Sequence, residues 1–212
     1  RYTNQLLRFQ KSWGKHNVNG LLAYEFNDWE MKFTDVYATG FLSGFEDFTT
    51  TSKPEKANGY RQAWAKQSYF TQWRYNYDNR YFGEVSLRRD GRSNFGSNNR
   101  YGNFFSFSGA WNMNNESWFK AQWVDMLKLR ASFGSVGNVP TSLYPSYSLY
   151  SVGASYNEQS GALISQIGNK DLTWEKTFTT GVGVDAAFFQ NRLTATLDFY
   201  VKNTSNILYQ VP

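Results

Sequence analysis

The stretch that decides the fold runs from Arg192 to Lys202 and reads RLTATLDFYVK. One set of alternate positions is apolar: Leu193, Ala195, Leu197, Phe199 and Val201. The other set is mostly polar: Arg192, Thr194, Thr196, Asp198, Tyr200 and Lys202. Because successive side chains of a β-strand point to opposite faces, this alternation predicts a long strand with one apolar and one polar face. A tilted strand of about 9–11 residues is long enough to cross a bilayer.

The same alternation recurs along the chain and predicts an all-β fold. We expect eight antiparallel strands, at residues 1–9, 16–26, 68–77, 80–89, 104–111, 127–136, 175–188 and 191–202. The expected fold class is therefore all-β, an antiparallel transmembrane β-barrel segment of about eight strands.

The connections between these strands alternate in length. Short turns are expected at residues 11–15, 78–79 and 189–191, with a medium connection at 112–126. Long irregular loops are expected at residues 27–66, 90–102 and 137–174. Transmembrane barrels of the outer-membrane type have short turns on the periplasmic side and long loops outside, so the long loops are expected to be extracellular.

The composition supports strands and excludes several classes of protein. The chain has 18 Phe, 15 Tyr and 8 Trp, with 17 Gly and only 4 Pro, and this favours strands over helices. No apolar run approaches about 18 residues, which excludes a transmembrane helix. The absence of cysteine excludes disulfides and thiolate chemistry. The net charge of +5 forms no basic run, which argues against nucleic-acid binding.

The sequence contains no convincing catalytic or metal-binding constellation. His16 is the only histidine, so a histidine-based metal site or a Ser-His-Asp triad would depend on one residue. Neighbouring carboxylates occur as Asp28 with Glu30 and as Glu46 with Asp47, but in an expected loop without a recognisable pocket. We therefore expect no enzymatic activity, no cofactor and no metal.

A series of motifs resembles one protein family, in its order and near its spacing. The matching stretches are Tyr77–Tyr81, Val85–Gly96, Asn98–Gly102, Phe104–Trp111, Leu127–Gly134 with Gly137-Asn138, Asn169–Lys176, Phe188–Leu193 and Tyr200–Asn203. Together they are similar to the SusC/RagA-like family of TonB-dependent outer-membrane transporters. Residues 1–66 match only in general character.

This resemblance implies a large plugged barrel in the outer membrane of a Gram-negative cell; a barrel of about 22 strands encloses a plugged lumen. It implies a SusD-like surface lipoprotein as a lid, TonB acting on the plug, and oligosaccharides or peptides as substrates. No TonB box, plug or signal segment is recognised, so we expect residues 1–212 to be part of the barrel wall. Inward polar residues would contact water, the plug or substrate: Arg74, Glu84, Arg88, Lys128, Arg130 and Asp198.

Two alternatives stay open from the sequence alone. An independent, structural eight-stranded barrel would require the first strand to pair with the last. A soluble, Trp-rich carbohydrate-binding sandwich predicts solubility in water without detergent, and the placement of the long loops at one end counts against it. Aromatic residues of the long loops could stack on sugars, contact a lid or pack against one another, and packing is favoured: Phe41, Phe45, Phe48, Tyr144, Tyr147, Tyr150, Tyr156 and Trp174.

Overall fold

The structure, a computed structural model, describes residues 1–45, 47–156 and 159–209. Its strands are β1 (Tyr2–Trp13), β2 (His16–Phe41), β3 (Thr51–Tyr77), β4 (Tyr81–Arg92), β5 (Tyr101–Asn112), β6 (Val124–Asn138), β7 (Leu149–Tyr156), β8 (Gln159–Gln166), β9 (Glu175–Phe188) and β10 (Leu193–Ser205). Two single-turn 3₁₀ helices, η1 (Phe48–Thr50) and η2 (Met113–Asn115), lie in connections. Among the described residues, no helix is long and apolar enough to cross a membrane.

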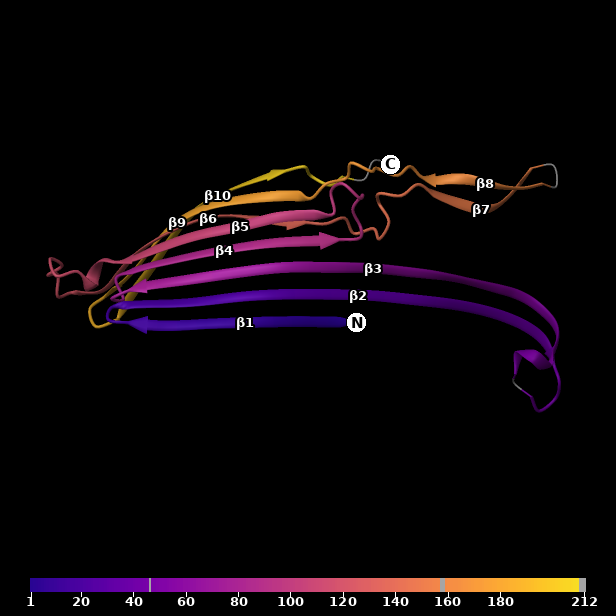
Figure 1. Cartoon of the computed structure of the whole chain (residues 1–212), viewed down its shortest axis with the longest axis horizontal. Helices are drawn as coiled ribbons and strands as arrows, with labels where there is room; N and C mark the ends of the chain where they lie inside the picture. The colour runs from indigo at the N-terminus through magenta and orange to yellow at the C-terminus, as the bar shows by residue number, and fades with distance from the viewer. Residues whose placement is uncertain (46, 157–158, 210–212) are drawn as a thin grey trace.

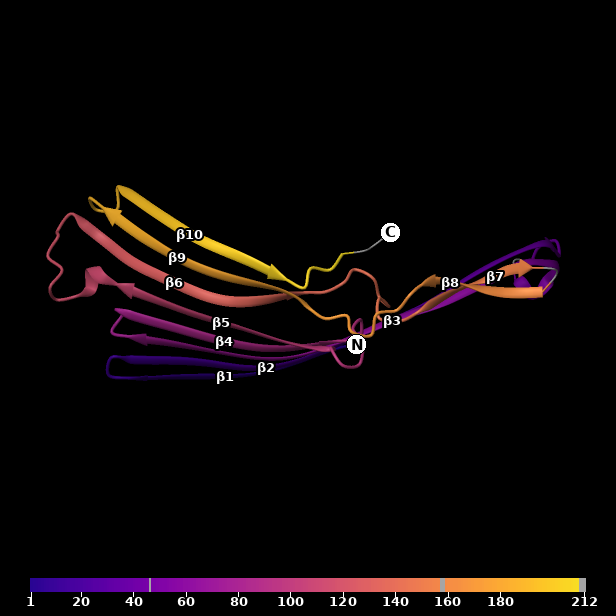
Figure 2. The same ribbon diagram turned by 90° about the horizontal axis from the view of Figure 1, so that it is seen from above.

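Eight of the strands form one curved antiparallel sheet, as Figures 1 and 2 show. Their order is β1-β2-β3-β4-β5-β6-β9-β10, so each strand of the sheet pairs with the next one along the chain that belongs to it. The expectation of an all-β, eight-stranded antiparallel sheet is therefore confirmed. β1 and β10 are its two edges and do not pair with each other, so the described residues do not form a closed eight-stranded barrel.

The register of the sheet separates its side chains into an apolar face and a polar face. On the apolar face, large side chains from every strand stay exposed, including Leu197 at 73% and Phe199 at 69%. No second sheet covers this face, because the other described sheet is only the β7–β8 hairpin beyond the loop end. A soluble monomer rarely leaves so large an apolar surface exposed, which argues against the sandwich alternative.

The two ends of the sheet differ. The connections from β1 to β2, β3 to β4, β5 to β6 and β9 to β10 all lie at one end, which we call the turn end (Figure 1). The β3–β4 turn needs positive φ at Asp78 (51°) and Asn79 (54°), a conformation that Asn and Asp tolerate better than most residues. The opposite end, the loop end, carries the long connections and both long hairpins (Figure 1).

The prediction of a long irregular loop at residues 27–66 is wrong. β2 continues to Phe41 and β3 starts at Thr51, so most of this segment is a paired hairpin that extends far beyond the sheet. Cross-strand ion pairs hold it, among them Arg61–Glu30 at 2.7 Å and Lys56–Asp35. Both of its faces are exposed to a large extent, so its sequence does not show the clean alternation of a half-buried strand.

The other two expected loops are shorter than predicted. Pairing between β4 and β5 continues to Gly91 and Tyr101, so the connection within 90–102 covers residues 93–100. The segment 137–174 contains the β7–β8 hairpin, whose irregular register again weakens the alternation.

The free edge of β3 is capped by side chains where β4 ends. Pairing with β4 stops at Lys66 and Arg92. Ser93 then takes both backbone groups of Ala65: its amide donates to the Ala65 carbonyl, and its hydroxyl accepts from the Ala65 amide. Two residues further, the Tyr144 hydroxyl accepts from the Ala63 amide at 2.8 Å and lies 3.3 Å from the Ala63 carbonyl.

A small core ties the loop end together. Phe95, Phe104 and Trp174 are almost fully buried against one another, with ring centroids 4.7 Å apart for Phe95–Trp174 and 5.3 Å apart for Phe104–Trp174. The Trp174 indole donates to the backbone carbonyl of Arg100, and the side-chain amide of Asn99 donates to the backbone carbonyl of Asp171. This loop-end core therefore fixes the 93–100 loop against the segment that leads into β9.

Candidate functional site

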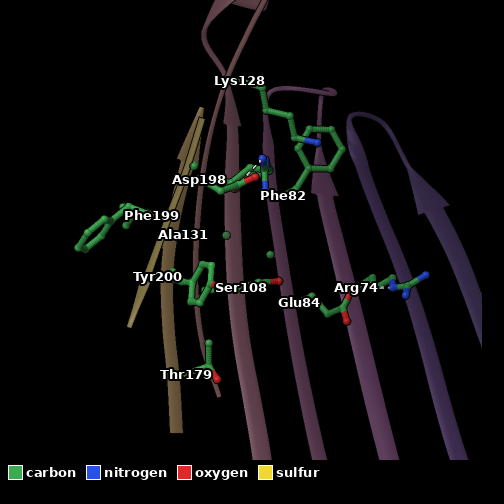
Figure 3. Close-up of a pocket in the computed structure, with 18 of the residues that line it drawn as sticks. Arg74, Phe82, Glu84, Ser108, Lys128, Ala131, Thr179, Asp198, Phe199 and Tyr200 are labelled. Atoms are coloured by element: carbon green, nitrogen blue, oxygen red, sulfur yellow. Dashed lines mark hydrogen bonds and ion pairs between the residues drawn. The ribbon is translucent and has the colours of Figure 1, made fainter. Parts of the chain in front are cut away.

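The candidate functional site is a hollow of about 880 Å³ on the polar face, near the turn end. Its residues come from every strand between β2 and β10 that belongs to the sheet. Figure 3 shows Asp198, Tyr200 and Lys128 in this hollow, whereas Phe199 points to the other side of β10. Small residues of the central strands keep the hollow open, namely Ser108, Ser132, Gly181 and Gly183.

The register brings the site residues into rows that cross the strands. One row runs from Arg74 through Glu84, Ser108 and Ser132 to Gly181. A neighbouring row joins Ala110, Arg130, Gly183 and Asp198. Residues more than 60 positions apart in the sequence, such as Arg130 and Asp198, therefore share one surface because the sheet is antiparallel and unbroken.

Arg130 is the centre of a charge cluster in the hollow. Its guanidinium donates to both carboxylate oxygens of Asp185, at 2.7 and 2.9 Å, and to Asp198 at 3.0 Å. The Thr196 hydroxyl also donates to Asp185. A planar guanidinium suits this forked geometry, so the cluster holds the side chains of β6, β9 and β10 in one arrangement.

The other charges of the hollow are only partly compensated. Glu84 accepts from Arg74 at 2.8 Å and from Gln72 at 2.6 Å. Within the described chain, neither Lys128 nor Lys202 has a carboxylate within ion-pair distance; each ammonium lies over a ring, Lys128 over Phe82 and Lys202 over Tyr200. The hollow can therefore attract an anionic or hydrogen-bonding surface. The bonds of Arg130 to Asp185 and Asp198 hold the side chains of the hollow in place.

The polar residues singled out in the sequence do come together. Arg74, Glu84, Lys128, Arg130 and Asp198 all line the hollow. Arg88 lies on the same face nearer the loop end, where it binds Asp90 at 2.8 Å.

Asp185 was missed, and Lys202, although placed on the polar face of its strand, was not named among the inward polar residues. Their signal was present in the sequence, since each lies an even number of residues from a polar-face neighbour on its own strand. Asp185 is two residues from Gly183, and Lys202 is four from Asp198.

The other candidate groups do not form a site. Asp28 pairs with Arg1, and Glu30 pairs with Arg61 and Lys32, whereas Glu46 lies outside the described residues. No group of three or more His, Cys, Asp or Glu side chains that could hold a metal occurs in the part of the chain that the structure describes.

Some loop aromatics contact another ring, although Phe41, Phe48 and Tyr147 among them also stay exposed. Trp174 is buried in the loop-end core, and the rings of Tyr144 and Tyr147 and of Phe41 and Phe48 are in contact. Phe45 and Tyr150 are exposed. The Tyr156 side chain lies outside the described part of the structure.

A second cluster marks the turn end, in the connection from β5 to β6. Glu116 accepts from the Tyr81 hydroxyl at 2.6 Å and from the Trp111 indole at 3.0 Å, with Arg80 at 3.4 Å. The hydrogen bonds from Tyr81 and Trp111, followed by the charge of Arg80, hold the pKa of Glu116 below its usual range. This carboxylate therefore ties the 112–123 connection to two neighbouring strands.

The two-faced open sheet and its matches to known proteins define the class. A family model described as TonB dependent receptor-like, beta-barrel, matches residues 1–212. The chain therefore belongs to the TonB-dependent receptor β-barrel family.

Individual relatives refine this assignment. TonB-dependent receptor P39 of Formosa agariphila is 34% identical over 202 residues, which cover 93% of this chain and 20% of that protein. TonB-dependent receptor SusC of Bacteroides thetaiotaomicron is 32% identical over 155 residues, 68% of this chain and 15% of that protein. The structure of the RagAB peptide transporter superposes with a TM-score of 0.84 at 29% identity and covers 100% of this chain and 24% of that chain.

These matches confirm the resemblance to SusC and RagA that the motifs carry. The chain spans about a fifth of the length of the curated relatives that match over nearly all of it.

Proposed function

We propose that the chain forms part of the wall of an outer-membrane transporter of the SusC/RagA type in a Gram-negative cell. In this proposal the apolar face contacts lipid, the polar face lines the lumen, the turn end is periplasmic and the loop end is extracellular. The observation that carries it is the open sheet with an uncovered apolar face, which matches the RagAB peptide transporter along its whole length.

The dimensions of the apolar face agree with a membrane position. The aromatic row Tyr77–Tyr81–Trp111 crosses β3, β4 and β5 at the turn end. On β4, Arg89 lies on the same face, eight residues after Tyr81. The nine residues from Tyr81 to Arg89 match the length of a tilted strand that crosses the hydrocarbon, about 9–11 residues. Aromatic rows at both interfaces are typical of transmembrane barrels.

The hollow would then face the plug or the passing substrate. Transport in this mechanism is physical movement driven through TonB and the plug, so the wall supplies a charged, water-lined surface rather than catalytic groups. The proposed partners are TonB, a SusD-like lipoprotein lid and outer-membrane lipid, and the proposed substrates are oligosaccharides or peptides. Three matching solved structures are of RagAB, a peptide transporter or importer, and this favours peptides as the first class to test.

The test uses the full-length parent protein in its own host. Deletion of its gene should abolish uptake of labelled peptides or oligosaccharides, and the protein should fractionate with the outer membrane together with a surface lipoprotein. The double charge reversal Lys128→Glu with Lys202→Glu should lower uptake without lowering the amount of protein in the membrane. Lys120→Glu, an exposed lysine in the β5–β6 connection, is the matched control. Unchanged uptake of both substrate classes after deletion would refute the proposal.

A further inference from the structure

We propose that the loop end of the apolar face carries a binding site for a phosphate-bearing lipid of the outer leaflet. This inference rests on the proposed function, because it needs the apolar face to contact the membrane and the loop end to lie outside. The site is a groove of about 590 Å³ whose lining includes Leu7, Leu22, Leu87 and Arg89. It lies on the opposite face of the sheet from the hollow.

Two neighbouring rows of the sheet give this groove two chemical zones. The row nearer the loop end is polar and consists, in register, of Gln5, Tyr24, Tyr69, Arg89 and Asn103. The next row toward the turn end consists of Leu7, Leu22, Thr71, Leu87 and Phe105. The rows are two residues apart, roughly 7 Å along the strands. The surface therefore changes from apolar to polar over one short step, as the boundary between acyl chains and headgroups does.

The polar row holds two phenol hydroxyls, of Tyr24 and Tyr69, whose protons bind no acceptor in the described part of the chain. The side-chain amide of Gln67 donates to the hydroxyls of Tyr69 (2.8 Å) and Tyr24 (3.3 Å), and Tyr101 donates to the Gln67 carbonyl oxygen at 3.0 Å. Tyr24 and Tyr69 act as acceptors in these bonds, and neither hydroxyl donates to an acceptor among the described residues. Each phenol therefore keeps one proton available for an external acceptor.

Arg89 supplies the charge. Its guanidinium lies 4.8 Å from the centroid of the Tyr101 ring, and it has no carboxylate within ion-pair distance in the described part of the chain. Tyr101 can reach over β4 because position 91 is glycine, whose missing side chain leaves room for the ring. By contrast, the neighbouring Arg88 on the polar face is paired with Asp90. Arg89 is thus an exposed cation in the polar row, next to the apolar row of Leu7, Leu22 and Leu87.

A phosphate at the head of an acyl lipid matches these features together. Guanidinium binds phosphate through charge-assisted, forked hydrogen bonds, and the two phenol protons are further donors. The acyl chains would lie along Leu7, Leu22 and Leu87. A neutral headgroup would satisfy the donors but would leave the charge of Arg89 uncompensated at the membrane surface.

The experiment measures lipid binding to the intact transporter purified in detergent. The probes are diphosphorylated lipid A and the same lipid A after its phosphates have been removed, so that the acyl chains are identical. Native mass spectrometry gives the affinity for each probe. The wild-type protein should prefer the phosphorylated probe by about tenfold, the effect expected of one hydrogen-bonded charge pair.

The variants locate this preference. Arg89→Gln should remove it, Arg89→Lys should keep most of it, and the pair Tyr24→Phe with Tyr69→Phe should reduce it. Arg8→Gln, which removes the same charge from the polar face of β1 outside the hollow, should leave it unchanged. A preference that survives Arg89→Gln, or that is absent from the wild type, would overturn the inference.

Uptake and outer-membrane fractionation are measured on the same proteins. If the wild-type protein fractionates with the outer membrane and keeps the lipid preference but takes up neither peptides nor oligosaccharides, the transporter assignment alone is refuted.

Discussion

Arg130 of β6 reaches across the whole of β9 to bind Asp198 of β10, with 3.0 Å between Nη2 and Oδ1. The residue between them in the register is Gly183. A side chain at this position would overlap the Asp198 carboxylate and crowd the guanidinium. The glycine therefore allows two polar side chains to meet above the backbone of a third strand.

Gly183→Ala should destabilise the sheet by about 1–3 kcal/mol, because the added methyl group must displace Asp198 from Arg130. Gly83→Ala on β4 is the matched control, since a Cβ there meets nothing within 4 Å. It should change the free energy of unfolding by less than about 0.5 kcal/mol. Urea unfolding of the barrel in lipid vesicles measures both values. Equal effects of the two substitutions would show that the close approach at position 183 does not matter.

Trp174→Ala should open the loop-end core, because it removes the partner of both Phe95 and Phe104. Loss of a large buried aromatic side chain costs about 3–5 kcal/mol, here as local rather than global stability. Amide hydrogen exchange should rise in residues 93–100 and stay unchanged in the centre of β9. Tyr150→Ala removes an exposed loop aromatic and serves as the control. Protection of 93–100 in Trp174→Ala would contradict the proposed role of this core.

Glu116→Gln should weaken the turn end in a pH-dependent manner. The pKa of Glu116 is held below its usual range by hydrogen bonds from Tyr81 and Trp111 and by the charge of Arg80. A carboxylate with a depressed pKa contributes stability that is complete above its unfolded-state pKa and disappears as the pH falls through the folded-state value. The difference in stability between wild type and Glu116→Gln should therefore be largest near neutral pH and should shrink below about pH 4.

Thermal unfolding across this pH range, with Asp171→Asn as the control, measures this difference. A difference that does not change with pH would assign the effect to packing instead of charge.

Leu197→Lys tests the assignment of the apolar face to lipid. A lysine on the lipid side near the bilayer midplane costs about 2–4 kcal/mol. Thr194→Lys, on the polar face of the same strand, should cost far less because the new charge would lie in water. Folding of the purified barrel into vesicles gives both free energies. A larger cost for Thr194→Lys than for Leu197→Lys would mean that the faces are assigned the wrong way round, and equal costs would contradict a lipid-facing apolar side.

The strands that carry a two-faced alternation could be predicted from the sequence, and they build the candidate site. Leu197 lies on the apolar face and its neighbour Asp198 lies on the polar face. A shift of the strand pairing by one residue would exchange the two faces. The same rule placed Arg74, Glu84 and Arg130 on one surface. Which residues of that surface meet could not be predicted, since the Arg130–Asp185–Asp198 cluster depends on the register between strands.

The hairpin beyond the sheet could not be predicted for a different physical reason. Its strands are exposed to a large extent on both faces, and ion pairs such as Arg61–Glu30 stabilise it in place of a buried side. Such pairs leave no period of two in the sequence. Packing was favoured for Trp174 and is confirmed, but its partners could not be predicted, because Phe95 and Trp174 lie far apart in the chain and outside the regular strands.

The hydroxyl of Tyr144, which is bonded to Ala63, limits how far the sheet can extend along the free edge of β3. A strand edge with free amide and carbonyl groups is a template on which a further strand can assemble. Where β4 ends, Ser93 and then Tyr144 occupy these groups at Ala65 and Ala63. The loop end is therefore stepped, because β2 and β3 extend well beyond the end of β4. The Tyr144 phenol lies beside this step and limits the pairing of a further strand along the free edge of β3.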